Sequence, residues 1–192
     1  MCAACDIAHA ASAATPTKQA RKKSPPRIAQ VLLSKQEERL CKVRVGDQMP
    51  AISLPQLGGG KKKLADLFGR KATVVVFWKA DRRMTHQQLV DVTPDITKPY
   101  GKDVSVVGIA VKESDASAEA VLKKAGANFT NMLDADGDAF AQVGSEKLPR
   151  TYLLDPQGKI LWFDLEYSLA TRRELKDALQ VVAAEAVAAS AK

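Results

Sequence analysis

Two long apolar runs constrain the fold of this 192-residue chain more than any other feature. Residues 72–78 read ATVVVFW and residues 104–111 read VSVVGIAV, with almost no polar side chain in either run. Strands that are buried on both faces, as in a parallel sheet covered by helices, have this continuous apolar pattern. Because a helix-like segment separates the two runs, we expect two central strands of an α/β domain.

The remaining segments predict a layered domain around these strands. Helical patterns cover residues 85–96, 114–125, 136–143 and 171–189, and strand patterns cover 51–57, 129–133, 151–154 and 160–163. A glycine turn at 58–60 and one helical turn at 64–69 precede the first long run. The order of elements predicts a three-layer α/β/α sandwich with a mixed central sheet.

The N-terminal part of the chain has a different composition. Residues 1–45 hold nine Lys or Arg against three Asp or Glu, and residues 1–27 are rich in Ala, Ser, Pro and Lys. We expect residues 1–27 to be a disordered basic extension. Such a basic tail can bind anionic lipid, nucleic acid or an acidic protein. Because no aromatic residues alternate with its charges, we expect no specific nucleic-acid surface.

Residues 28–44 form what we call the lead-in segment. Ile28, Val31 and Leu40 fall roughly on one helical face together with Leu32, and Ser34 with Glu37 has the spacing of a capping box. We therefore expect one or two helical turns here, followed by the main domain over residues 45–188.

The three cysteines are Cys2, Cys5 and Cys41, and we expect all three outside the folded domain. Cys2 and Cys5 form a C-x-x-C with His9 nearby, but a structural zinc site needs four ligands and a second half-site is missing. Residues 134–145 begin like a calcium loop, but they have Ala139 where glycine is needed and Ser145 where glutamate is needed. We expect no metal and no cofactor.

The sequence holds no apolar run of the roughly 18 residues that a transmembrane helix requires, so we expect no transmembrane segment. Residues 11–13 resemble a signal-peptidase site, although no basic residue precedes them. A signal peptide that precedes or overlaps the N-terminus would make the protein extracytoplasmic, and otherwise it is cytoplasmic. Both localisations stay open, as does the oligomeric state.

Two further patterns concern the last elements. Trp162 and Phe163 should lie on opposite faces of one strand, one in the core and the other covered by a helix. Arg172 and Arg173 stand in the first turn of the last helix, where the helix dipole disfavours cations. This placement predicts an acidic partner, for which Glu166 and Asp164 are the nearest candidates.

Four segments resemble a known family. They read VGDQMPAISLP at 45–55, KATVVVFWKA at 71–80, MLDADGDAFAQVG at 132–144 and LPRTYLLDPQGKI at 148–160. They resemble redoxin domains, the thioredoxin-like group that contains alkyl hydroperoxide reductase/thiol-specific antioxidant proteins and thioredoxin-like disulfide reductases. The resemblance implies a thioredoxin-like fold, an antioxidant or thiol–disulfide oxidoreductase activity, and a cis-proline at Pro149.

The resemblance breaks at the reactive residues. In the disulfide-reductase branch, a C-x-x-C follows the Phe-Trp pair at a helix start, and the same alignment here places Arg82 and Thr85 at the two cysteine positions. In the peroxidase branch a single cysteine comes slightly later, near His86, and Asp81 matches an acidic residue before it. The chain has no cysteine after Cys41, so neither thiol mechanism can run within this domain alone.

The residues at this place predict binding. Arg82 and Arg83 at a helix start, beneath Pro149 and beside Arg150, favour an anion such as a carboxylate, a phosphate or an acidic peptide. An exposed polar loop left by the loss of the cysteines is the alternative. The resemblance implies that Leu148, just before the proline, offers backbone groups to an extended peptide. The full candidate binding set is Trp78, Asp81, Arg82, Arg83, His86, Leu148, Pro149 and Arg150.

Three hypotheses follow for function. The first is a redox-inactive redoxin domain that binds a peptide or acidic protein at the Pro149 groove or serves as a scaffold. The second is a thiol oxidoreductase that uses Cys2 and Cys5. The third is a non-thiol enzyme that uses Arg82, Arg83 and His86, of which His86 has the chemistry of a general acid or base.

Overall fold

The computed structural model describes residues 25–189. A five-stranded mixed sheet in the order β5-β4-β3-β6-β7 forms its centre. Strand β3 pairs parallel with β4 and antiparallel with β6, while β4–β5 is parallel and β6–β7 antiparallel. The five strands are β3 (Ala72–Trp78), β4 (Val104–Val111), β5 (Thr130–Asp134), β6 (Arg150–Leu154) and β7 (Ile160–Leu165).

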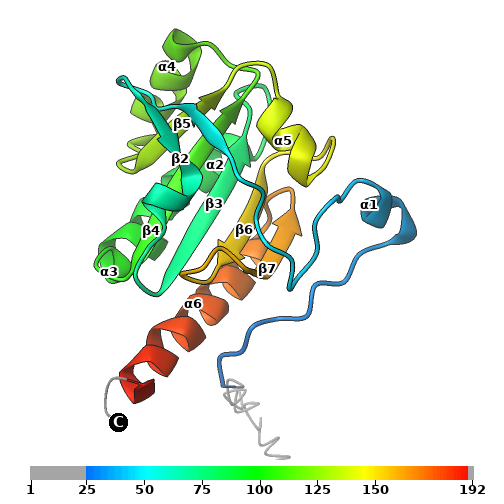
Figure 1. Ribbon diagram of the computed structural model, residues 1–192, viewed down its shortest axis with the longest axis vertical. Helices are drawn as coiled ribbons and strands as arrows, with labels where there is room; N and C mark the ends of the chain where they lie inside the picture. Colours follow the sequence, from blue (N-terminus) through cyan, green and yellow to red (C-terminus); the bar gives the residue numbers. More distant parts are fainter. Residues whose placement is uncertain (1–24, 190–192) are drawn as a thin grey trace, which may run out of the picture.

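Helices cover both faces of this sheet (Figure 1). Helices α2 (Thr85–Val92), α4 (Asp115–Ala125) and α6 (Leu169–Ala189) pack on one face, and α5 (Asp138–Val143) packs on the other with the 3-10 turn η1 (Leu64–Leu67). The α2 helix continues through a π-helical turn (Thr93–Thr97) into α3 (Lys98–Tyr100). This is the thioredoxin-like α/β/α sandwich predicted from the sequence.

The strand periodicity explains where the two cores lie. All seven residues of β3 are buried, with Val75 and Phe77 in the core on the α5 side and Val74, Val76 and Trp78 in the core on the α2 side. In β7, Trp162 and Phe163 divide between the same two cores, as predicted. The sheet is thus packed on both faces, as its apolar runs required.

A small two-stranded hairpin precedes the main sheet. It pairs β1 (Ser53–Pro55) with β2 (Lys61–Lys63) through three glycines of positive φ, Gly58 to Gly60. Leu57 N donates to Asn131 O over 2.9 Å, so the hairpin lies beside β5. The glycine turn predicted at residues 58–60 is confirmed, and it closes a hairpin.

The lead-in segment differs from the prediction. Only α1 (Lys35–Arg39) is helical, although the predicted capping box between Ser34 and Glu37 is present on both sides. Residues 25–34 are not helical, and Leu32, expected on a buried helical face, is 80% exposed. Val31 instead packs against both cores from an extended chain. The apolar residues of this segment bury themselves by tertiary packing, which a helical spacing cannot reveal.

Candidate functional site

The loop between β3 and α2 carries most of the exposed candidate residues. Trp78 ends β3, and α2 begins at Thr85. Between and beside them, Asp81, Arg82 and Arg83 are exposed, as is His86. The sequence therefore places a cationic loop at the N-terminal end of an eight-residue helix, as expected.

Short ion pairs organise the first half of this loop. Lys79 Nζ lies 2.7 Å from one carboxylate oxygen of Asp81, and Arg82 Nε lies 3.3 Å from the other. The hydrogen bond from Lys79, helped by the charge of Arg82, lowers the pKa of Asp81. Arg83 makes no ion pair within the described residues. Asp81 thus offsets one of the three positive charges of Lys79, Arg82 and Arg83, and the two arginines stay exposed to solvent.

The loop before β6 meets the same end of the sheet. The Leu148–Pro149 bond is cis, which confirms the prediction. Phe77 pairs with Arg150 in the antiparallel β3–β6 ladder. The chain after β3 and the chain before β6 therefore lie at the same end of the strands, which we call the binding edge. The cationic loop and the cis-proline loop are therefore neighbours in the fold.

Two residues that sequence reasoning missed tie α2 to this edge. Gln88 is 2% exposed, and its side-chain amide donates to Thr151 Oγ1 over 2.5 Å. Among the described residues, Gln88 Oε1 and Thr85 Oγ1 are buried without a hydrogen-bond partner. A cavity of about 20 Å³ beside Gln88 has room for about one water molecule. Gln88 lies next to Leu89 on the buried side of α2. A polar residue on the apolar face of the expected helix was the sequence feature that could have predicted this buried hydrogen bond.

Four of the predicted binding residues are buried. Trp78 is fully buried, and its indole nitrogen donates to Asn131 Oδ1 over 3.1 Å. Leu148 is 8% exposed and Pro149 is also buried. These buried side chains support the loops from inside the domain. The side chains that can contact a ligand directly are the exposed ones, Asp81, Arg82, Arg83 and His86.

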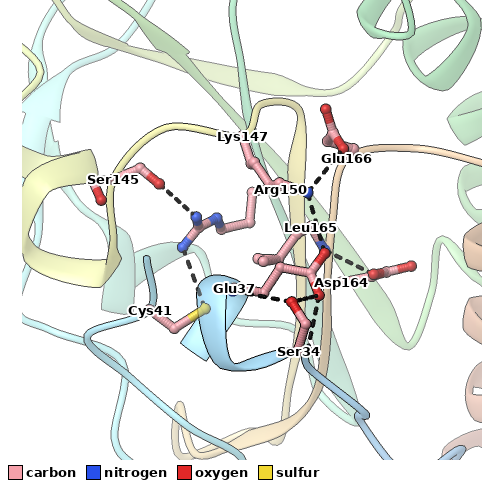
Figure 2. A network of polar contacts seen from close by, with 9 residues as sticks. All are labelled: Ser34, Glu37, Cys41, Ser145, Lys147, Arg150, Asp164, Leu165 and Glu166. Carbon is pink, nitrogen blue, oxygen red and sulfur yellow. Dashed lines mark hydrogen bonds and ion pairs between the residues drawn. The ribbon is translucent and has the colours of Figure 1, made fainter. Parts of the chain in front are cut away.

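Arg150 differs most from its predicted role. We expected a cation beside an exposed anion site, but the side chain is fully buried and its guanidinium stacks 5.3 Å from the centre of the Phe140 ring. It donates to Ser145 O over 2.8 Å and approaches Cys41 Sγ at 3.9 Å (Figure 2). It also donates to Leu40 O over 3.3 Å. Arg150 therefore links the lead-in segment to the loop before β6 inside the domain, and its side chain does not face a ligand at the cationic loop.

Cys41 is the second correction. The structure places Cys41 in the folded domain, 7% exposed, in the core on the α5 side. Its backbone forms an isolated antiparallel β-bridge with Gly144. Burial raises the pKa of its thiol despite the nearby positive charge of Arg150. Because α2 packs on the opposite face of the sheet, Cys41 cannot stand in for a thiol at the start of α2. Cys2 and Cys5 lie outside the described residues.

The polar cluster between α2 and α6 corrects a third expectation. Arg172 does not pair with Glu166 or Asp164 but with Asp91 at 3.2 Å and Asp95 at 2.5 Å. Asp91 also accepts a hydrogen bond from the Tyr167 hydroxyl over 2.8 Å. The unfavourable position of Arg172 in its helix correctly predicted an acidic partner, but the two partners come from α2 and the π-helical turn after it, about eighty residues earlier in the chain.

Metal binding finds no support in the described part of the chain. No group of three or more His, Cys, Asp or Glu side chains there could hold an ion. The calcium-like segment has another role, because Asp134 accepts hydrogen bonds from the backbone of Ala139 at 3.1 Å and Phe140 at 2.8 Å. Its carboxylate caps α5. In residues 25–189, none of the helices is long and apolar enough to span a membrane.

Comparison with known proteins agrees with the fold. The model of the AhpC/TSA family matches residues 45–163. This match covers more than half of the chain, and the chain belongs to the AhpC/TSA family.

Several curated relatives carry names of thiol–disulfide enzymes. The thiol:disulfide interchange protein DsbE of Pseudomonas aeruginosa is 31% identical over 60% of this chain and 63% of its own length. The thiol-disulfide oxidoreductase ResA of Bacillus subtilis is 26% identical over 60% of this chain and 64% of its own length. The chain thus spans less than two thirds of the length of these relatives.

Solved structures give the same fold. A provisionally assigned thiol:disulfide interchange protein DsbE from Chlorobium tepidum matches with a TM-score of 0.67 and 24% identity, over 73% of this chain and 98% of that one. A secreted disulfide oxidoreductase from Mycobacterium tuberculosis matches with a TM-score of 0.57 and 24% identity, over 70% and 96%. At this identity the likeness concerns the thioredoxin-like fold.

Proposed function

We propose that this protein is a thioredoxin-like domain that binds an extended peptide segment of an acidic partner protein without exchanging thiols. The binding edge lies between the cationic loop, with Arg82 and Arg83, and the loop that ends at Pro149. In this proposal the protein keeps the fold of its relatives and binds a peptide, but it does not carry out the thiol–disulfide exchange for which those relatives are named.

The observation that carries this proposal is the pair Arg82 and Thr85. These residues occupy the two positions that the family resemblance assigns to C-x-x-C, and residues 42–192 contain no cysteine. A guanidinium only donates hydrogen bonds and is always protonated, and a threonine hydroxyl does not form a disulfide. Neither residue can take over the exchange step.

The charge of the loop supports an acidic partner. Arg82 is 53% exposed in its side chain, Arg83 is exposed, and both precede the first turn of α2. Backbone N–H groups at a helix start and nearby guanidinium groups both favour carboxylates. The backbone beside Pro149 supplies main-chain groups that an extended peptide can pair with.

A second candidate is a thiol oxidoreductase that uses Cys2 and Cys5. Their C-x-x-C spacing and the names of the relatives favour it. In that reaction the dithiol would become a disulfide and a partner disulfide would become two thiols, so two electrons move to the partner. The domain would then bind the substrate while the N-terminal region carries the chemistry.

The proposal is tested by peptide binding measured with fluorescence anisotropy. Three labelled, cysteine-free, unstructured peptides carry negative, zero and positive net charge. We expect the acidic peptide to bind most tightly and the R82A/R83A variant to weaken it by roughly tenfold, as for two charge-assisted contacts. The K62A/K63A variant removes the same charge from the exposed β2 strand and should bind as the wild type does. Equal binding by both double variants would overturn the proposal.

A further inference from the structure

The loop before the cis-proline has an unusual backbone. Among the described residues, four non-glycine residues have positive φ, and three of them meet here: Glu146 at 51°, Lys147 at 37° and Glu166 at 65°. The fourth is Lys112. A side chain disfavours this left-handed region, so such residues persist only where surrounding contacts hold them, and they gather at functional sites.

The backbone of the lead-in segment holds one end of this loop. Ser145 N donates to Leu40 O over 2.9 Å, and Lys42 N donates to Val143 O over 3.0 Å. The buried guanidinium of Arg150 donates to both sides of this contact, to Ser145 O (Figure 2) and to Leu40 O. The lead-in segment is therefore joined to the loop by main-chain bonds that a fully buried cation ties together.

Ion pairs hold the loop at Lys147 itself. Its ammonium group lies 3.1 Å from Glu37 in α1 and 3.4 Å from Glu166 after β7 (Figure 2). Glu37 is fixed in turn, because the backbone and hydroxyl of Ser34 donate to its carboxylate over 3.0 and 2.8 Å. Lys147 thus links two of the three left-handed positions to a helix that lies 110 residues earlier.

We propose that the lead-in segment positions the cis-proline loop, with Glu37 and Arg150 as positioning residues. The contacts of Ser34, Glu37 and Leu40 hold Glu146 and Lys147 in their left-handed conformation, and this fixes the direction in which Leu148 presents its backbone. The lead-in segment precedes residue 45, where the family match begins. The part of this inference that concerns peptide affinity rests on the proposed function.

The test is amide hydrogen exchange at Ser145 in the full chain. The E37K variant removes one of the two carboxylate partners of Lys147 and places a second cation beside it. The matched control is E38K, which makes the same charge change at the next residue, an exposed glutamate without an ion pair among the described residues. We expect exchange at Ser145 to rise roughly fivefold in E37K, as for the loss of a partly exposed ion pair at the upper end of the usual range. Equal exchange in the two variants would overturn the inference.

Peptide affinity separates this inference from the proposed function. Added positive charge alone would strengthen binding of the acidic peptide in both variants. A misplaced loop would weaken it in E37K only, which is the result we expect. If the wild type binds no peptide while E37K still raises exchange at Ser145, the proposed function fails and the positioning of the loop stands.

Discussion

Arg172 Nη1 lies 3.2 Å from Asp91 Oδ1, and this ion pair joins the start of α6 to the C-terminal end of α2. The same guanidinium bonds both carboxylate oxygens of Asp95. Because the other end of α2 forms the candidate site, the pair fixes the helix on which the site is built. A cation in the first turn of a helix, unfavourable for the helix dipole, is here stabilised by two carboxylates.

The R172M variant should lower the free energy of unfolding by about 1–2 kcal/mol. A fully buried pair would cost more, but the Arg172 side chain is 34% exposed and solvent screens it. The control is K176M, because Lys176 contacts Asp95 from a side chain that is 46% exposed, and it should cost about 0.5 kcal/mol or less. Urea unfolding monitored by fluorescence measures both, and equal costs would contradict the account.

The carboxyl group of Glu37 should titrate far below its usual range. Hydrogen bonds from the Ser34 backbone and hydroxyl, followed by the bond from Lys147, lower its pKa from 4.5 to about 2. Since the folded-state pKa is depressed, its contribution to docking of α1 is complete above about pH 4.5 and is lost as the pH falls towards 2. A carbon-detected NMR titration gives the midpoint.

Two variants locate the cause of that shift. S34A removes the hydroxyl bond and K147M removes the ammonium group, so each should raise the pKa of Glu37. E38Q leaves these contacts in place and should not move the midpoint. A wild-type midpoint near 4.5 would show that the contacts around Glu37 do not form in solution.

Gly108 in β4 should be intolerant of any side chain. A methyl group there would overlap the Asn131 side chain and lie 3.1 Å from Trp78 Nε1, so G108A should cost about 2–3 kcal/mol and break the Trp78–Asn131 hydrogen bond. In G126A the added methyl meets no atom within 4 Å, and only the φ of +61° opposes it, at about 1 kcal/mol. The indole N–H resonance of Trp78 should shift in G108A alone.

The sequence predicted the sheet better than the site. The bounds of β3 and β4 agree with the structure residue for residue, because a run of buried apolar residues ends where polar residues begin. The burial of Arg150 and Cys41 was not predictable, since both depend on the lead-in segment, which packs across the α5 side of the domain. No local pattern of spacing records that long-range contact.

The positions of Arg82 and Thr85 predict a gain of function. Arg82 is exposed, and Thr85 is 1% exposed at the start of α2, so a cysteine pair there would have one accessible and one sheltered thiol. The helix N-terminus lowers thiol pKa values. We therefore expect the R82C/T85C variant to form a disulfide and to catalyse insulin reduction by dithiothreitol. The matched control, R83C/H86C, has the same spacing one residue later and should catalyse it poorly.

The most direct test of the central claim is the reduction of insulin by dithiothreitol in the presence of the wild-type protein and of the C2S/C5S variant. The account predicts that neither protein accelerates the reaction above the rate with dithiothreitol alone, because the domain binds a partner and exchanges no thiols. Acceleration by the wild type that disappears in C2S/C5S would contradict it and would make Cys2 and Cys5 the reactive pair.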